Sequence, residues 1–195
     1  MAVAGLGSSH ALIGAPLNIS GGTNGGAAYL YNTNGTLEMT FTNPAALSGD
    51  QFGVSLAAVG DDRVLIGANQ GGASRPTGGF AYLFATNGTL LMTYTNPTPL
   101  AFDGFGFSVA AAGDSRVLIG ALGDDVGANS AGVAYLYATA NGGYTPGLNG
   151  FPSGTTVACG DACARRSNQV PGRPDQQRIE HPRHPVPMTA LIHPT

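Results

Sequence analysis

The feature that most constrains the fold of this 195-residue chain is a sequence repeat with a spacing of 53 residues. Residues 60–68 read GDDRVLIGA, and they recur at 113–121 as GDSRVLIGA and at 7–15 as GSSHALIGA. A second block recurs in the same register, at residues 28–31, 81–84 and 134–137. Three copies without a gap indicate that one supersecondary unit is used repeatedly.

Each copy contains four short strand-like runs separated by glycine or Asn-Gly. In the middle copy these runs are Val54–Val59, Arg63–Gly67, Phe80–Phe84 and Leu90–Thr95. The run Val64-Leu65-Ile66 is apolar without alternation, which is typical of a strand covered on both faces. Asn87-Gly88 between two apolar runs predicts a hairpin with a type I′ turn.

Four strands per unit and a period near 50 residues favour a propeller. We therefore predict an all-β fold, a partial β-propeller of about three four-stranded antiparallel blades. The predicted blades are residues 1–49, 50–102 and 103–137, the third of them incomplete. Aromatic residues recur at alternate positions in each copy, which favours packing between blades over a carbohydrate platform. They are Tyr29, Tyr31, Tyr82, Phe84, Tyr135 and Tyr137.

The repeat pattern ends after Tyr137, and we expect residues 138–195 to form an irregular, disordered tail. Cys159 and Cys163 precede His181 and His184, but the adjacent prolines and the missing apolar pattern argue against a zinc site. The Phe-Gly pair of the first copy would fall before Met1. We therefore interpret the chain as a truncated or frameshifted piece of a longer propeller.

Composition excludes several classes of partner. The net charge of −3 offers no basic face for nucleic acid, and no apolar run is long enough to cross a bilayer. The first residues lack the basic and apolar regions of a signal peptide. An open arc of blades leaves apolar faces and strand edges exposed, so we expect poor solubility or self-association through open blade faces.

Two short motifs carry a family resemblance. Phe52-Gly53 and Phe105-Gly106 are each followed, twelve residues after the glycine, by Leu-Ile-Gly-Ala, and the first copy ends on Gly14-Ala15-Pro16. This pattern resembles FG-GAP repeats over about residues 1–137. Such repeats form the propeller of integrin α subunits and occur in bacterial surface and secreted proteins, and the Asn-Gly-Thr-Leu element resembles the bacterial branch. The resemblance implies an extracellular or cell-surface location.

Many FG-GAP repeats bind calcium through an Asp-rich loop, so calcium is the cofactor that the resemblance raises. Here that loop has shrunk to Gly60–Arg63 or Gly113–Arg116, too few oxygens for a calcium cage, and we assign no cofactor and no calcium ligand. Asp124, Asp125 and Asn129 are the remaining metal candidates. An Asp-rich surface turn explains them better, because the other copies lack the paired carboxylates.

The sequence predicts no enzyme. Gly113-Asp114-Ser115 resembles the start of a hydrolase motif, but its repeat mate has no serine, and His10 is the only histidine before residue 181. The prediction is a non-catalytic propeller fragment that binds a protein or carbohydrate ligand, in an adhesion role implied by the resemblance. The alternatives are a structural spacer without its own ligand and, less favoured, a calcium-binding repeat.

Overall fold

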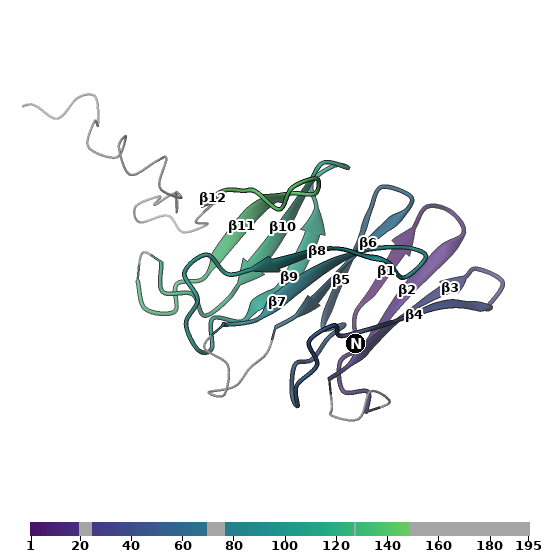
Figure 1. Ribbon diagram of the computed structural model, residues 1–195, viewed down its shortest axis with the longest axis horizontal. Helices are drawn as coiled ribbons and strands as arrows, with labels where there is room; N and C mark the ends of the chain where they lie inside the picture. The colour runs from purple at the N-terminus through teal and green to yellow at the C-terminus, as the bar shows by residue number, and fades with distance from the viewer. Residues whose placement is uncertain (20–24, 70–76, 127, 149–195) are drawn as a thin grey trace, which may run out of the picture.

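The computed structural model describes residues 1–19, 25–69, 77–126 and 128–148. These residues form twelve strands and no helix, arranged as three four-stranded antiparallel sheets that follow one another along the chain (Figure 1). The predicted all-β fold of about three blades is confirmed. Within the described residues no helical segment could span a bilayer.

Each sheet is a meander in which consecutive strands pair. The first blade contains β1 (Val3–Leu6), β2 (His10–Ala15), β3 (Ala27–Asn32) and β4 (Leu37–Thr42). The second contains β5 (Ser55–Val59), β6 (Arg63–Ala68), β7 (Phe80–Ala85) and β8 (Leu90–Thr95). The third contains β9 (Phe105–Ala111), β10 (Arg116–Ala121), β11 (Val133–Ala138) and β12 (Tyr144–Leu148).

The third blade extends beyond the predicted end at residue 137. β12 pairs antiparallel with β11 and supplies a fourth strand, although its sequence lacks the apolar pattern of β4 and β8. Pairing on an outer strand is made by backbone groups, so a hydrophobicity pattern alone misses it. The predicted disordered tail beyond Leu148 lies outside the described residues.

The predicted Asn-Gly hairpin forms, but its turn differs from the predicted type. Gly88 has a φ of 89°, whereas Asn87 stays at negative φ. The Gly88 N–H donates to Ala85 O at 3.0 Å, and the Ala85 N–H donates to Thr89 O at 2.9 Å. This is a three-residue loop with one left-handed residue, which needs only a single glycine.

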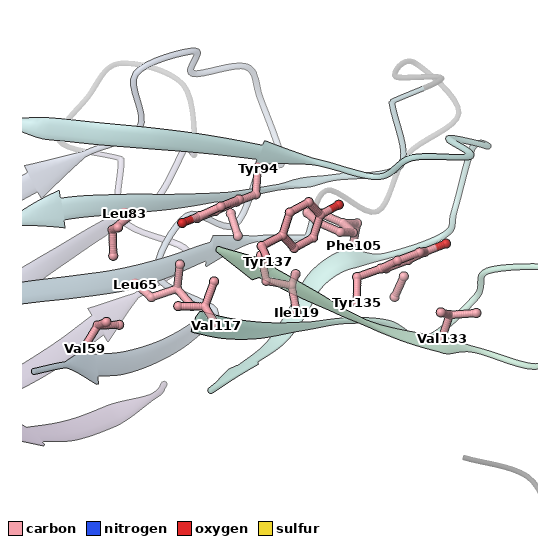
Figure 2. Close-up of a cluster of buried hydrophobic side chains, with 12 residues drawn as sticks. Val59, Leu65, Leu83, Tyr94, Phe105, Val117, Ile119, Val133, Tyr135 and Tyr137 are labelled. Atoms are coloured by element: carbon pink, nitrogen blue, oxygen red, sulfur yellow. The ribbon is translucent and has the colours of Figure 1, made fainter. Parts of the chain in front are cut away.

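The hydrophobic core lies between blades rather than within them. One cluster joins the first and second blades, and it contains Leu12, Leu30 and Phe41 on one side and Phe52 and Ile66 on the other. A second cluster joins the second and third blades (Figure 2). Its largest members are Leu65, Leu83, Tyr94, Phe105, Ile119, Tyr135 and Tyr137. A four-stranded sheet thus buries both faces only when a blade lies on each side.

The Phe-Gly pair is the joint between neighbouring blades. Phe105 is fully buried and lies 6.0 Å, ring centre to ring centre, from both Tyr135 and Tyr137. Gly106 has a φ of 86°, and a Cβ atom on Gly67 of the preceding blade would overlap its carbonyl oxygen. Glycine at both positions lets two backbones approach to van der Waals distance.

Candidate interaction surface

The long loops of the molecule gather at one end of the blades. The second and fourth strands of each blade end on the same side, because consecutive strands are antiparallel. The loop from the second to the third strand and the connection to the next blade therefore both start at this end. Among the described residues, the opposite end carries short turns that begin at Gly7, Gly60 and Gly113, together with the Asn-Gly hairpins (Figure 1). We call the first end the loop end.

Large apolar side chains are exposed at the loop end. Six of them lie on the loops or connections of all three blades, each more than half exposed. They are Leu17, Ile19, Leu47, Leu100, Phe102 and Leu122. The six side chains lie at one end of the blades, which makes this end the candidate for an interaction site.

Phe102 is held in a backbone conformation that phenylalanine rarely adopts. Its φ is 72°, in the left-handed region, and its side chain is 59% exposed. A bulky residue in this region costs about 1–3 kcal/mol and persists only where the surroundings fix it. The equivalent position in the preceding connection is Gly49, which has a φ of 86°, so the left-handed conformation belongs to the fold of the connection. What distinguishes position 102 is that a large aromatic side chain is exposed there.

The connection that carries Phe102 is fixed by Asp103. Its buried Oδ2 accepts hydrogen bonds from the Leu100 backbone N–H and from Asn96 Nδ2, both at 2.7 Å. The preceding connection is built in the same way, with Asp50 accepting from Asn43 and from the Leu47 N–H at 2.7 Å. Asn-Pro followed by Asp seven residues after the Asn is therefore the sequence signal for this closed connection.

Asp124 ties the connection to the neighbouring loop. Its Oδ2 accepts from the Tyr135 hydroxyl at 2.7 Å and from Asn96 Nδ2 at 3.0 Å, and its Oδ1 accepts from the Val126 N–H at 3.0 Å. The Gly123 N–H adds a bond to Asp103 O at 2.8 Å. The two loops that present Phe102 and Leu122 are therefore one braced unit.

Burial raises the pKa of two groups in this network, Asp103 and Tyr135. Removal from water is the largest cause that raises the pKa of Asp103, and the nearby carboxylates of Asp124 and Asp125 raise it further, while the Leu100 N–H opposes them. Burial also raises the pKa of Tyr135, and its bond to Asp124 favours the protonated phenol. A phenol that stays protonated is the donor that the Asp124 carboxylate requires.

The three metal candidates of the sequence do not come together as a cage. Asp124 is only 1% exposed, and its oxygens are occupied by the bonds above. Asp125 is exposed and accepts from the Ser130 N–H at 2.6 Å, and Asn129 is exposed in the same turn. No group of three or more acidic, histidine or cysteine side chains with metal-binding spacing occurs among residues 1–19, 25–69, 77–126 and 128–148.

The Gly113-Asp114-Ser115 motif is a turn in which backbone oxygens accept hydrogen bonds. Asp114 O accepts from Arg63 Nη2 at 2.9 Å and from Thr139 Oγ1 at 3.1 Å. Arg63 also pairs with Asp62 at 3.2 Å. The side chain of Arg63 therefore joins the neighbouring aspartate to the backbone of the next blade.

The serine in contact with His10 is Ser9 and not Ser115. Ser9 Oγ lies 2.9 Å from His10 Nδ1, and His10 Nε2 lies 2.9 Å from Glu38 Oε2. Sequence reasoning missed this chain because β2 and β4 bring His10 and Glu38 together only in the folded blade. Ser9 and Glu38 are exposed and His10 is partly exposed, and none of the three lines the cavity of the first blade.

Consecutive four-stranded meanders with their cores between them define a β-propeller-type repeat protein. Residues 99–137 match the family described as FG-GAP repeat. The matched segment contains Phe102, Asp103, the Phe105-Gly106 joint, β9, β10 and all but the last residue of β11. None of the curated proteins compared with this chain matches it.

Proposed function

We propose that this chain is a non-catalytic binding scaffold that contacts a protein partner through its loop end. The observation that carries this proposal is Phe102, a strained and exposed aromatic side chain on a connection braced by buried aspartates. Aromatic side chains presented on a rigid frame are the usual anchors of protein interfaces. Asp103 and Asp124 then act as supports for the surface, and no reacting group is required.

The FG-GAP match supports a setting for this binding. Repeats of this family are associated with extracellular and surface proteins, and we place the chain in that setting, in the bacterial branch that the Asn-Gly-Thr-Leu element resembles. Adhesion is the role that follows. A spacer array is the second candidate, favoured by the fact that the repeat positions facing other blades are used for packing rather than for binding.

The proposal is tested by measuring binding of the full chain to a panel of purified extracellular-matrix proteins and to a glycan array. The test variant replaces two of the six exposed loop-end side chains, Phe102→Ser with Leu122→Ser. The matched control is Leu91→Ser, which removes a side chain of similar exposure from the outer strand β8 of the middle blade.

We expect the wild type and Leu91→Ser to bind the same matrix protein, and the double variant to lose about 30-fold or more in affinity. Binding only to glycans, unchanged in the double variant, would contradict a protein site at the loop end. Binding to neither panel would favour the spacer.

A further inference from the structure

At each internal boundary, a face of one blade packs against a face of the next blade, and the two faces carry different residue types. The face directed towards the next blade carries leucines, and in the middle blade Leu65 and Leu83 are fully buried there. The face directed towards the preceding blade carries Ile66 and the pair Tyr82 and Phe84. We call these the forward face and the backward face.

The first blade presents a backward face that no other described blade covers. Ile13, Tyr29 and Tyr31 occupy the positions of the middle blade's isoleucine and aromatic pair, but they are only partly buried. Together with Met1 and Pro16 they line an open cavity of about 510 Å³. At the two internal boundaries, the equivalent isoleucine and aromatic pair are buried in the core.

The third blade presents a forward face. Leu118 and Leu136 stand at the positions of the buried leucines of the middle blade and are partly exposed. Gly120 also matches Gly67, where a Cβ atom would overlap the next blade. On Gly120 it would meet only the Ser108 side chain of its own strand pair. This face therefore has the side chains and the clearance that an adjoining blade requires.

We propose that these two faces bind each other between copies of the chain, the forward face of one copy on the backward face of a second copy. The occupant follows from the molecule itself, because the same pairing of faces forms both internal boundaries. The two faces are unlike, so the contact is heterologous and leaves one face free on each copy. Copies then add head to tail rather than closing a two-fold dimer.

A polar contact accompanies the pairing. At the boundary of the second and third blades, Arg63 Nη2 donates to Asp114 O at 2.9 Å. Arg116 is the repeat mate of this arginine and is exposed on the third blade. In the docked pair it would reach the backbone oxygen of Ser8 in the second copy, which is the mate of Asp114 two repeats earlier.

One part of the internal boundary is missing from the contact between copies. Phe52 packs edge-on against Phe84, with ring planes at 89°, and Phe105 packs on Tyr137 at 87°. At the backward face of the first blade, an open cavity lies beside Tyr29 and Tyr31, the repeat mates of Tyr82 and Phe84. A contact that leaves this cavity unfilled buries less aromatic surface than an internal boundary, so we expect it to depend on concentration.

The experiment is sedimentation velocity on the full chain over a concentration series. Two variants block one face each with a charge at a partly exposed position, Tyr31→Arg on the backward face and Leu136→Arg on the forward face. Leu91→Arg is the control outside both faces, and far-ultraviolet circular dichroism checks that each variant keeps its strands. A further control, Phe102→Ser, removes the proposed loop-end anchor and leaves both faces intact.

We expect the wild type, Leu91→Arg and Phe102→Ser to form a series of oligomers that grows with concentration. Each blocked variant alone should remain monomeric, with association weakened about 30-fold or more. An equimolar mixture of the two blocked variants should form a one-to-one dimer and nothing larger, because each supplies the face that the other has lost.

Three results would overturn the proposal. They are a wild type that stays monomeric throughout, oligomers that persist in both blocked variants, and a mixture of the blocked variants that remains monomeric. Loss of matrix binding in Phe102→Ser with assembly intact would separate the two proposals.

An extension sharpens the test. Adding Phe-Gly directly before Met1 places a phenylalanine at the position of Phe52 and Phe105. We expect this chain to associate about 30-fold more tightly than one extended by Ala-Gly, because a buried aromatic anchor is typically a hot spot. Equal association of the two extended chains would contradict docking in the geometry of the internal boundaries.

Discussion

The middle and third blades carry nearly the same residues in surroundings that differ on one side. Leu65 and Leu118 belong to the identical strand sequence Arg-Val-Leu-Ile-Gly-Ala, in β6 and β10. Leu65 is fully buried against the third blade, whereas Leu118 is partly exposed. Val64 and Val117, which face the preceding blade in each case, are both fully buried.

The difference shows that a single blade of this kind cannot bury its own hydrophobic side chains. Its strands form from local pattern and turns, but each face becomes core only when a neighbour covers it. Stability is then approximately a sum over boundaries, as in other repeat proteins. Substitutions at matched positions of the two blades can measure the contribution of one boundary directly.

The largest contrast is expected within one strand of the third blade. Phe105→Ala should lower the free energy of unfolding by about 3–5 kcal/mol, because it empties the joint between two blades. Phe107→Ala removes a side chain that is 48% exposed and should change stability by no more than about 0.5 kcal/mol. Urea denaturation followed by circular dichroism measures both, and similar losses would contradict a core located between blades.

The leucine pair compares the covered and uncovered faces. Leu65→Ala should cost about 3 kcal/mol, since it leaves a cavity at a fully buried site. Leu118→Ala should cost about 1 kcal/mol, because solvent already reaches its side chain. The measurement is made at low protein concentration, where copies do not cover the forward face. Equal losses there would mean that the forward face of the third blade is buried in solution.

The glycine pair tests the close approach of two blades. Gly67→Ala should destabilise the chain by about 2–3 kcal/mol, since the new methyl group meets the backbone of Gly106 and the Ser55 hydroxyl. Gly120→Ala meets only the Ser108 hydroxyl, which can rotate away, and should cost less than about 1 kcal/mol. Thermal unfolding compares the two, and a tolerated Gly67→Ala would contradict the boundary geometry.

The tyrosine pair probes the brace at the loop end. Tyr135→Phe removes a 2.7 Å hydrogen bond to the buried Asp124 and should cost about 1.5 kcal/mol. Tyr29→Phe in the first blade removes an acceptor for Asn18 Nδ2 at a partly buried site and should cost less than about 1 kcal/mol. Equal effects in urea denaturation would show that the network contributes little to the loop end.

The smallest effect expected is a pH dependence from Asp103. Its pKa is raised in the folded state, mainly by burial, so the folded chain binds a proton more readily than the unfolded chain. Between the unfolded pKa of about 4 and the raised folded pKa, this group makes stability rise as pH falls. The wild type should therefore gain stability relative to Asp103→Asn between about pH 7 and pH 4.

Urea denaturation at several pH values measures this gain, with Asp62→Asn as the control for removing an exposed carboxylate. A pH-independent difference between wild type and Asp103→Asn would contradict the raised pKa.

Sequence pattern anticipated most of the blades but little of the candidate surface. The runs around Val64-Leu65-Ile66 and Asn87-Gly88 are local signals, and the strands form where they indicate. The strand β12 was not predicted, because its sequence has no apolar alternation. The left-handed conformation of Phe102 was missed, although the repeat places Gly49, with a φ of 86°, at the equivalent position. The bracing of Phe102 could not be predicted, because it depends on Asp124, which is far along the chain from Asn96.

The sequence by itself determined the 53-residue unit, its strands and its Phe-Gly joint, because hydrophobic pattern and glycine placement act over a few residues. Only the tertiary structure decided which of two identical strands is core and which is surface. The physical reason is that a side chain on a blade face is buried only where a neighbouring blade covers that face. It also decided that Asp124 is a buried support while the adjacent Asp125 is exposed, since their difference arises from the partners that neighbouring loops bring to one of them.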